Sequence, residues 1–112
     1  MTTFNYGDVV LVPFPFTDQT SSKNRPAVII SSSAYNKARN NLIVIAISSQ
    51  FGSPCTFGDL VISDWKNAGL VKPSIVKPIL FSIKNTLIIR KLGQLQPDDQ
   101  ITLRNSVHSL FG

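Results

Sequence analysis

The sequence predicts a mainly β protein, a small barrel or strongly curved sheet with one C-terminal helix. Short runs of β-branched and aliphatic residues are separated by turns rich in proline, glycine and serine, a pattern typical of small barrels and curved sheets. The longest run, 42–47, is continuously apolar, as expected for a strand buried on both faces. A segment near the end of the chain has helical periodicity instead.

Five to seven short strands are expected. The first is the β-branched run 9–12, and Pro13 and Pro15 are expected to interrupt it because proline cannot donate to a strand ladder. The polar stretch 17–24 predicts a loop. The other expected strands are 26–30, 42–47, 59–63, 74–83 and 87–95.

The one long helix is expected to start at Pro97. Proline tolerates the first helical position, and the two aspartates that follow it favour the positive end of the helix dipole. Three apolar residues then repeat at the spacing of one helical face: Leu103, Val107 and Leu110. Single helical turns are expected within 31–41 and over 64–69, where Gly69 would end the turn.

The length of 112 residues predicts a single domain over 1–112. Lys and Arg number 11 against 6 acidic residues, all aspartate, for a net charge of +5. A positive field attracts polyanions such as nucleic acids. A net charge of this size is also usual for a soluble small domain. Charge alone therefore supports nucleic-acid binding and a merely solubilising surface about equally.

Cys55 and His108 are the only residues of their kinds. They exclude an internal disulfide framework, and they are too few for a His and Cys zinc site in one subunit. No metal or other cofactor is therefore predicted. The N-terminal residues lack the pattern of a signal peptide, and no apolar run approaches the roughly 20 residues that span a bilayer. We expect a cytoplasmic protein.

Several segments resemble the MazF/PemK family of toxins. Residues 7–31 read GDVVLVPFPFTDQTSSKNRPAVIIS, which is a Gly-Asp strand, a turn of aromatics and prolines, a polar loop, Arg-Pro and a second strand. The segments VIAISSQ (44–50), GLVKPSIV (69–76) and RKLGQL (90–95) also resemble family motifs. Each piece is unspecific by itself, and their ordered combination over most of the chain carries the resemblance.

The resemblance implies an SH3-like twisted barrel of the CcdB/Kid/MazF type with a C-terminal helix, usually a homodimer. It implies sequence-specific cleavage of single-stranded RNA without metal. It also implies a cognate antitoxin, and a basic groove would suit an acidic or disordered tail of that partner.

Arg25 matches the catalytic arginine of the family, and Ser48 matches a position where the family usually has threonine. A guanidinium is always charged and its planar fork fits phosphate oxygens, while the serine hydroxyl can donate to the same phosphate. Serine lacks the methyl that restricts the threonine rotamer. The family often has an acid just before the arginine, whereas Asp18 is the nearest one here, and the general base stays unassigned.

Six further residues are expected to contact RNA. The polar loop and the aromatic turn before it would line the groove, two lysines would hold phosphates, and a glutamine would read a base edge. Specific RNA recognition favours such contacts to unpaired bases. The residues are Phe16, Thr17, Lys23, Ser49, Gln50 and Lys77.

Other conspicuous residues have structural interpretations that we favour. For Phe14, packing in the barrel is favoured over stacking on bases; for Phe16 packing is also favoured, and a contact with RNA stays open as the alternative. Trp65 is expected to cover a sheet edge. His108 would lie at the C-terminal end of the helix, where a cation is favoured. Asp8 would fix a local turn or pair with a basic neighbour.

Two alternative functions stay open at this stage. The CcdB branch of the same barrel inhibits DNA gyrase and cuts nothing; the pair of Arg25 and Ser48 favours a ribonuclease over it. A degenerate member that only binds RNA or its antitoxin is the other alternative, and the serine at position 48 and the missing acid keep it open.

Overall fold

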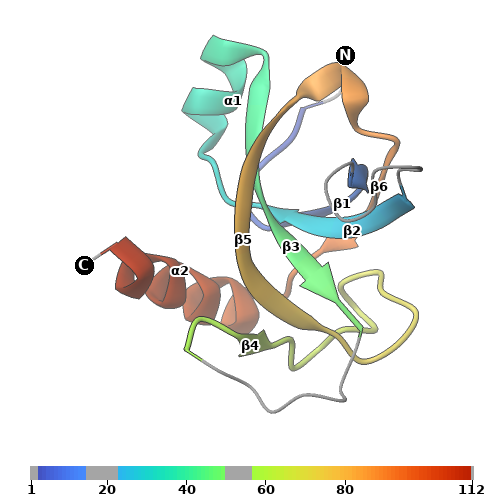
Figure 1. Ribbon diagram of the computed structural model, residues 1–112, viewed down its shortest axis with the longest axis vertical. Helices are drawn as coiled ribbons and strands as arrows, with labels where there is room; N and C mark the ends of the chain where they lie inside the picture. Colours follow the sequence, from blue (N-terminus) through green and yellow to red (C-terminus); the bar gives the residue numbers. More distant parts are fainter. Residues whose placement is uncertain (1–2, 15–22, 50–56, 112) are drawn as a thin grey trace.

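The fold is a six-stranded antiparallel sheet that curls into a half-barrel, with a helix at the C-terminus (Figure 1). The computed structural model describes residues 3–14, 23–49 and 57–111. Strands lie across the sheet in the order β4, β5, β3, β2, β1, β6. Their bounds are β1 Asp8–Phe14, β2 Lys23–Ile29, β3 Asn41–Ser48, β4 Leu60–Val61, β5 Ile75–Lys84 and β6 Arg90–Gln94. The predicted fold class is confirmed.

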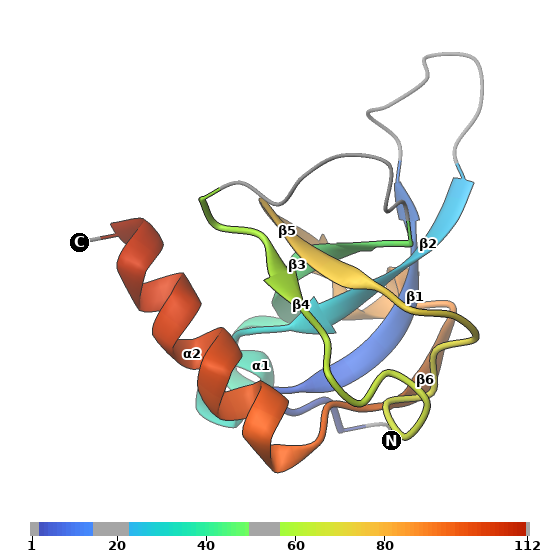
Figure 2. The same cartoon turned by 90° about the horizontal axis from the view of Figure 1, so that it is seen from below.

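Three helical elements complete the described chain: α1 (Ser33–Arg39), the short 3-10 helix η1 (Asn85–Leu87) and α2 (Pro97–Phe111). In Figure 1, α2 lies beside the lower part of β3 and β5. Seen from below in Figure 2, it follows one flank of the curled sheet. None of the helices in the described ranges is long and apolar enough to cross a lipid bilayer.

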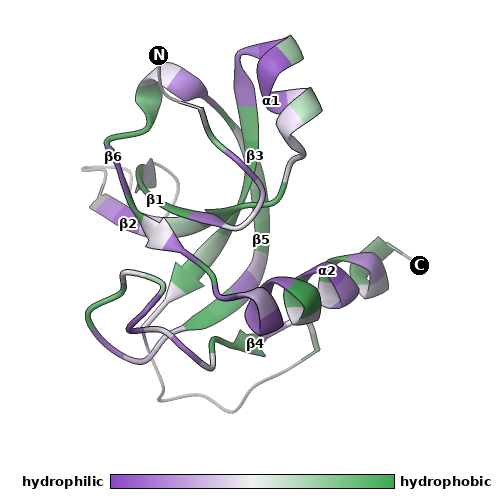
Figure 3. Cartoon of the chain, turned by 180° about the vertical axis from the view of Figure 1, so that it is seen from behind, coloured by the Kyte–Doolittle hydropathy of each residue, from purple (hydrophilic) through white to green (hydrophobic). Residues whose placement is uncertain are grey.

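The central strand β3 is buried on both faces, as its continuous apolar run predicts. It pairs with β2 on one side and β5 on the other. Its alternate side chains enter two separate hydrophobic clusters: Ile45 and Ile47 belong to the one that also contains Leu103 of α2, and Leu42 and Val44 belong to the other. Figure 3 shows the corresponding hydrophobic colouring of the sheet.

The prediction that Pro13 interrupts the first strand is wrong, because β1 runs through it to Phe14. The backbone carbonyl of Leu11 accepts a hydrogen bond from the Ile89 N–H, so odd positions of β1 here face the side of β6. The pairing with β6 ends at Leu11. The missing N–H of Pro13 therefore faces an open edge of the sheet, where proline is tolerated.

Several expected boundaries also change. The strand expected over 26–30 is β2, which begins at Lys23 inside the stretch 17–24 predicted as a loop, and the strand expected over 59–63 is only Leu60–Val61. The helical turn within 31–41 is the complete helix α1, which is capped by the Ser32 hydroxyl accepting from the Tyr35 N–H. Residues 63–69 form successive turns rather than a helix. The strand expected over 87–95 begins only at Arg90, because the chain before it closes η1 with a hydrogen bond from the Ile88 N–H to the Asn85 carbonyl.

The helix α2 begins at Pro97 as predicted. Leu103 is buried in the core and Val107 packs against the same cluster, while hydrophobic and hydrophilic residues alternate along the helix in Figure 3. The N-terminal segment is joined to α2 by the Tyr6 hydroxyl, which donates to the Gln100 carbonyl at 3.0 Å. The predicted helix and its apolar face are confirmed.

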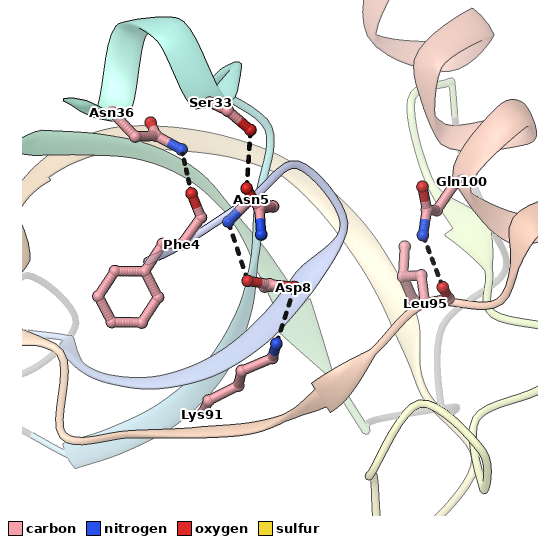
Figure 4. A network of polar contacts seen from close by, with 8 residues as sticks. All are labelled: Phe4, Asn5, Asp8, Ser33, Asn36, Lys91, Leu95 and Gln100. Atoms are coloured by element: carbon pink, nitrogen blue, oxygen red, sulfur yellow. Dashed lines mark hydrogen bonds and ion pairs between the residues drawn. The ribbon is translucent and has the colours of Figure 1, made fainter. Parts of the chain in front are cut away.

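Asp8 both fixes a turn and forms an ion pair with a basic residue, Lys91, as predicted (Figure 4). Its side chain is 1% exposed, it accepts the Asn5 N–H at 2.9 Å, and it lies 3.3 Å from the Lys91 ammonium. Nearby, Asn36 of α1 donates to the Phe4 carbonyl at 3.0 Å. The first residues are thereby attached to α1 and β6.

Candidate active site

A pocket of about 480 Å³ opens where β2 begins and β3 ends. This volume lies within the range of about 300–1,000 Å³ usual for ligand sites. Its walls are residues 24–26 of β2, residues 47–49 at the end of β3, and residues 70–72 with Ser74 from the segment that leads into β5. No acidic residue contributes to this lining within the described part of the chain.

The pairing of β2 with β3 brings the two predicted catalytic residues to this pocket. Ala27 is opposite Ala46 and Val28 is opposite Ile45. Arg25 lies two residues before Ala27 on β2 and Ser48 lies two residues after Ala46 on β3, so both are at the same end of the paired strands. Both residues line the pocket.

Arg25 is half-buried and directs a positive charge to the pocket lining. Among the described residues it forms no ion pair, since the two pairs found there join Lys77 to Asp59 and Lys91 to Asp8. A guanidinium in this setting can bind an anion bidentately. Ser48, also half-buried, adds a small hydroxyl beside it.

The third wall is held in place by hydrogen bonds rather than by a regular element. The buried Ser74 hydroxyl donates to the Lys72 carbonyl at 2.9 Å, and the Ser74 carbonyl accepts from the Ile62 N–H at 3.1 Å. The Asp99 carboxylate of α2 accepts the N–H groups of Ser63 and Asp64 at 3.1 and 3.0 Å. Asp99 thus fixes the segment that leads to the pocket.

Besides the buried Ser74, sequence reasoning missed two polar residues of the pocket, Asn24 and Lys72. Both are exposed, and nothing in the local pattern distinguishes them from ordinary surface residues. The available signals were weak: Asn24 directly precedes Arg25, and Lys72 lies within the family-like segment 69–76.

The predicted RNA-contacting residues fall into different places. Ser49 is exposed and lines the pocket. Lys23 pairs through its backbone with Phe14, and its side chain lies outside what the structure describes. Lys77 is not in the pocket lining, and its ammonium is 3.0 Å from Asp59, whose side chain is only 2% exposed. Three predicted residues lie outside the described ranges: Phe16, Thr17 and Gln50.

The structural interpretations of Phe14 and His108 are confirmed. Phe14 is buried and meets Phe81 edge to face, with ring centroids 5.1 Å apart. Trp65 packs against the core cluster that contains Leu103. His108 lies exposed in the last turns of α2. No group of three or more His, Cys, Asp or Glu side chains is close enough to hold a metal ion within the described ranges.

Comparison with known families identifies the chain. A model of the PemK-like, MazF-like toxins of type II toxin–antitoxin systems matches residues 5–111, nearly the whole sequence. The chain belongs to this family. The resemblance inferred from the ordered motifs is confirmed.

Solved structures agree on the fold of this MazF/PemK-type chain. An endoribonuclease in complex with its cognate antitoxin, from a mycobacterial species, is 12% identical with a TM-score of 0.75 and covers 100% of this chain and 96% of its own. A MazE–MazF structure from Deinococcus radiodurans is 18% identical with a TM-score of 0.77, and the match covers 99% of this chain and 98% of the other. The Mycobacterium tuberculosis toxin MazF-mt6 is 18% identical with a TM-score of 0.73, and the match covers 93% of this chain and 95% of the other. No protein with a curated functional description matches by sequence.

Proposed function

We propose that this MazF/PemK-type chain is a sequence-specific endoribonuclease that cleaves single-stranded RNA without a metal ion. The observation that carries the proposal is that Arg25 and Ser48 line one pocket without an acidic neighbour in its described lining. A positive, partly enclosed hollow of this kind suits a phosphate, and RNA supplies its own nucleophile beside each phosphate.

The proposed reaction is an internal transesterification. The 2′-oxygen attacks the neighbouring phosphorus, its proton leaves, and the bond from phosphorus to the 5′-oxygen of the next nucleotide breaks. That oxygen takes up a proton. The products are a 2′,3′-cyclic phosphate and a 5′-hydroxyl, and atoms and charge balance without an external reagent. Holding the sugar and phosphate in line can contribute about 7–11 kcal/mol.

Arg25 would stabilise the charge that accumulates on the phosphate oxygens. Its fork can reach two oxygens at once, and its half-buried position keeps the interaction less screened than on an open surface. A guanidinium carries a permanent positive charge and is a poor general base, so the proposed role of Arg25 is electrostatic and the base is not assigned to it.

Ser48 would donate a hydrogen bond to the same phosphate from the adjacent strand. A hydroxyl at this register position is sufficient for that contact, whether it comes from serine or threonine. The methyl of threonine would restrict the rotamer, so serine is expected to hold the hydroxyl less firmly.

The RNA strand is proposed to continue from the pocket across neighbouring surfaces. Ser49 lines the pocket, which supports it as a proposed contact, and Lys23 belongs to the same end of β2 as Arg25. Phe16, Thr17 and Gln50 stay predicted contacts. Lys77 would have to leave Asp59 before it could bind a phosphate, and it has the weakest support of the six.

A cognate antitoxin is the second proposed partner. Two of the similar structures are complexes of a toxin with an antitoxin. The net charge of +5 and a pocket lining with no acidic residue among those described favour an acidic, disordered segment that becomes ordered on binding. We also propose that the protein works as a homodimer.

The experiment that tests the function uses the purified protein, a defined single-stranded RNA and an excess of EDTA. We expect cuts at a short sequence, with a 2′,3′-cyclic phosphate and a 5′-hydroxyl at the new ends. Growth arrest on expression with intact RNA would support a gyrase inhibitor instead. RNA or antitoxin binding without any cleavage would support a degenerate member of the family.

A further inference from the structure

The pocket contains a second cation that the proposed reaction does not use. Lys72 lines it from the segment before β5, across from Arg25 on β2. We propose that Lys72 binds the phosphate next to the scissile one, so that the pocket holds two consecutive phosphates of the RNA strand. This inference rests on the proposed function and adds a substrate-positioning residue to it.

Arg25 and the segment that contains Lys72 reach the pocket from strands on opposite sides of β3. Arg25 is on the strand to one side, and Ile75 of β5 is the register partner of Ser48 on the other side. Two strand spacings separate β2 from β5, which is roughly 10 Å. Lys72 precedes Ile75 by a few residues in the segment that lies near the end of β3 (Figure 1). One phosphate at Arg25 and Ser48 therefore leaves room for its neighbour at Lys72.

The backbone of Lys72 is fixed before any ligand binds. Its carbonyl accepts the hydroxyl of the buried Ser74, and Pro73 restricts the residue before it to extended conformations. Only the side chain has to be ordered on binding. A pre-positioned backbone lowers the entropic cost of holding a phosphate there.

The ammonium of Lys72 is available, in contrast to that of Lys77. Lys72 is exposed and forms no ion pair among the described residues, whereas Lys77 is engaged by the nearly buried Asp59. Beside it, Val71 is 89% exposed and lines the same pocket. An apolar side chain at this position can contact the ribose or base between the two phosphates, which is consistent with a nucleotide chain rather than a lone anion.

The test measures binding to a short, mixed-sequence, 5′-fluorescein-labelled 2′-fluoro-RNA, which lacks the attacking hydroxyl and stays intact. The dissociation constant is recorded over a series of salt concentrations for the native chain, Lys72→Ala, Lys72→Arg and the control Lys66→Ala. Lys66 lies in the preceding turn, is exposed and is outside the pocket lining. Its replacement removes the same charge from the same loop.

We expect Lys72→Ala to weaken binding and to reduce the slope of log K against log salt by about 0.7, the value for one lost phosphate contact on a single strand. Lys72→Arg should retain the slope. Equal slopes for Lys72→Ala and Lys66→Ala would overturn the inference while leaving the proposed function intact. A native chain that neither binds this probe nor cleaves unmodified RNA would overturn both.

Discussion

Gly69 and Gly93 meet backbone to backbone, and this contact places the turn over 63–69 against β6. A Cβ atom on Gly93 would lie 2.7 Å from the carbonyl carbon of Ala68, and one on Gly69 would lie 2.7 Å from the carbonyl carbon of Leu92. Gly69 also has a φ of +91°, a backbone conformation that residues other than glycine rarely adopt. Leu70, the next residue after Gly69, is the first residue of this pocket wall, so the contact fixes where the wall begins.

The first prediction is that Gly93→Ala destabilises the protein by about 1–3 kcal/mol, the usual cost of forcing atoms into a packed site. The obstacle is backbone rather than a flexible side chain, so little relief is available. Urea unfolding gives the change in free energy. Asn105→Ala, at an exposed position of α2, is the control and should change stability by less than about 0.5 kcal/mol. Equal stability of the two variants would contradict the contact.

The sequence indicated only one half of this relationship. Gly69 was predicted to stop a helical turn, which is a local role that a single glycine can signal. That it also contacts Gly93 depends on how β6 pairs with β1, and no local pattern reports such a pairing. By contrast, β3 and α2 were predictable because their burial patterns are complete within one segment: a continuous apolar run for β3 and the repeat that contains Leu103 for α2.

The second prediction concerns Arg25. Replacing it with alanine should lower the rate of RNA cleavage by about 10²–10³-fold, the effect typical of losing one donor that stabilises a transition state. Arg25→Lys keeps the charge but loses the planar fork, so it should recover only part of the rate. Single-turnover cleavage of a defined RNA in EDTA measures both.

Arg90→Ala is the matched control for the Arg25 variants. It removes the same charge from an exposed position of β6 that does not line the pocket, and its cleavage rate should stay near that of the native chain. Native-like activity in Arg25→Ala would remove Arg25 from the site, whereas equal losses in both arginine variants would point to a general effect of net charge.

The third prediction compares two changes at Ser48, the loss of its hydroxyl and the addition of the methyl group that threonine has. Ser48→Ala removes one hydrogen bond to a charged group, worth about 1.5–3 kcal/mol, so the cleavage rate should fall by roughly 10- to 100-fold. Ser48→Thr restores the residue usual in the family and should cleave at least as fast as the native chain. If only Ser48→Thr cleaves and the native chain does not, this protein is a degenerate member.

Only those residues of the candidate site that lie in family-like motifs could be predicted from the sequence. Arg25 and Ser48 were predicted because each lies in a family-like segment, and both line the same pocket at the end of β2 and β3. Lys72 and Lys77 show the limit. Both are lysines in the same stretch of sequence, and only the fold reveals that one faces the pocket while the other is paired with Asp59. An ion pair between distant residues leaves no local trace.

The fourth prediction is a loss of stability at high pH through Tyr6. Burial raises the pKa of Tyr6 above its usual value of about 10, and the nearby Arg104, 4.7 Å from the ring, opposes that rise. The unfolded chain therefore releases the tyrosine proton first as pH increases. The stabilising contribution is complete below about pH 10 and is lost as pH rises through the folded-state pKa.

Urea unfolding between about pH 8 and pH 11 tests this relationship with two variants of opposite effect. Tyr6→Phe removes the titrating group, so its stability should fall less steeply with pH than that of the native chain. At the low end it should be less stable by about 0.5–1.5 kcal/mol, because the hydrogen bond to the Gln100 carbonyl is lost. Arg104→Ala removes the opposing charge and should make the fall larger. Parallel curves for the native chain and Tyr6→Phe would show that the tyrosine contributes nothing to the pH dependence, and would leave the Tyr6 hydroxyl with a purely structural role at the junction with α2.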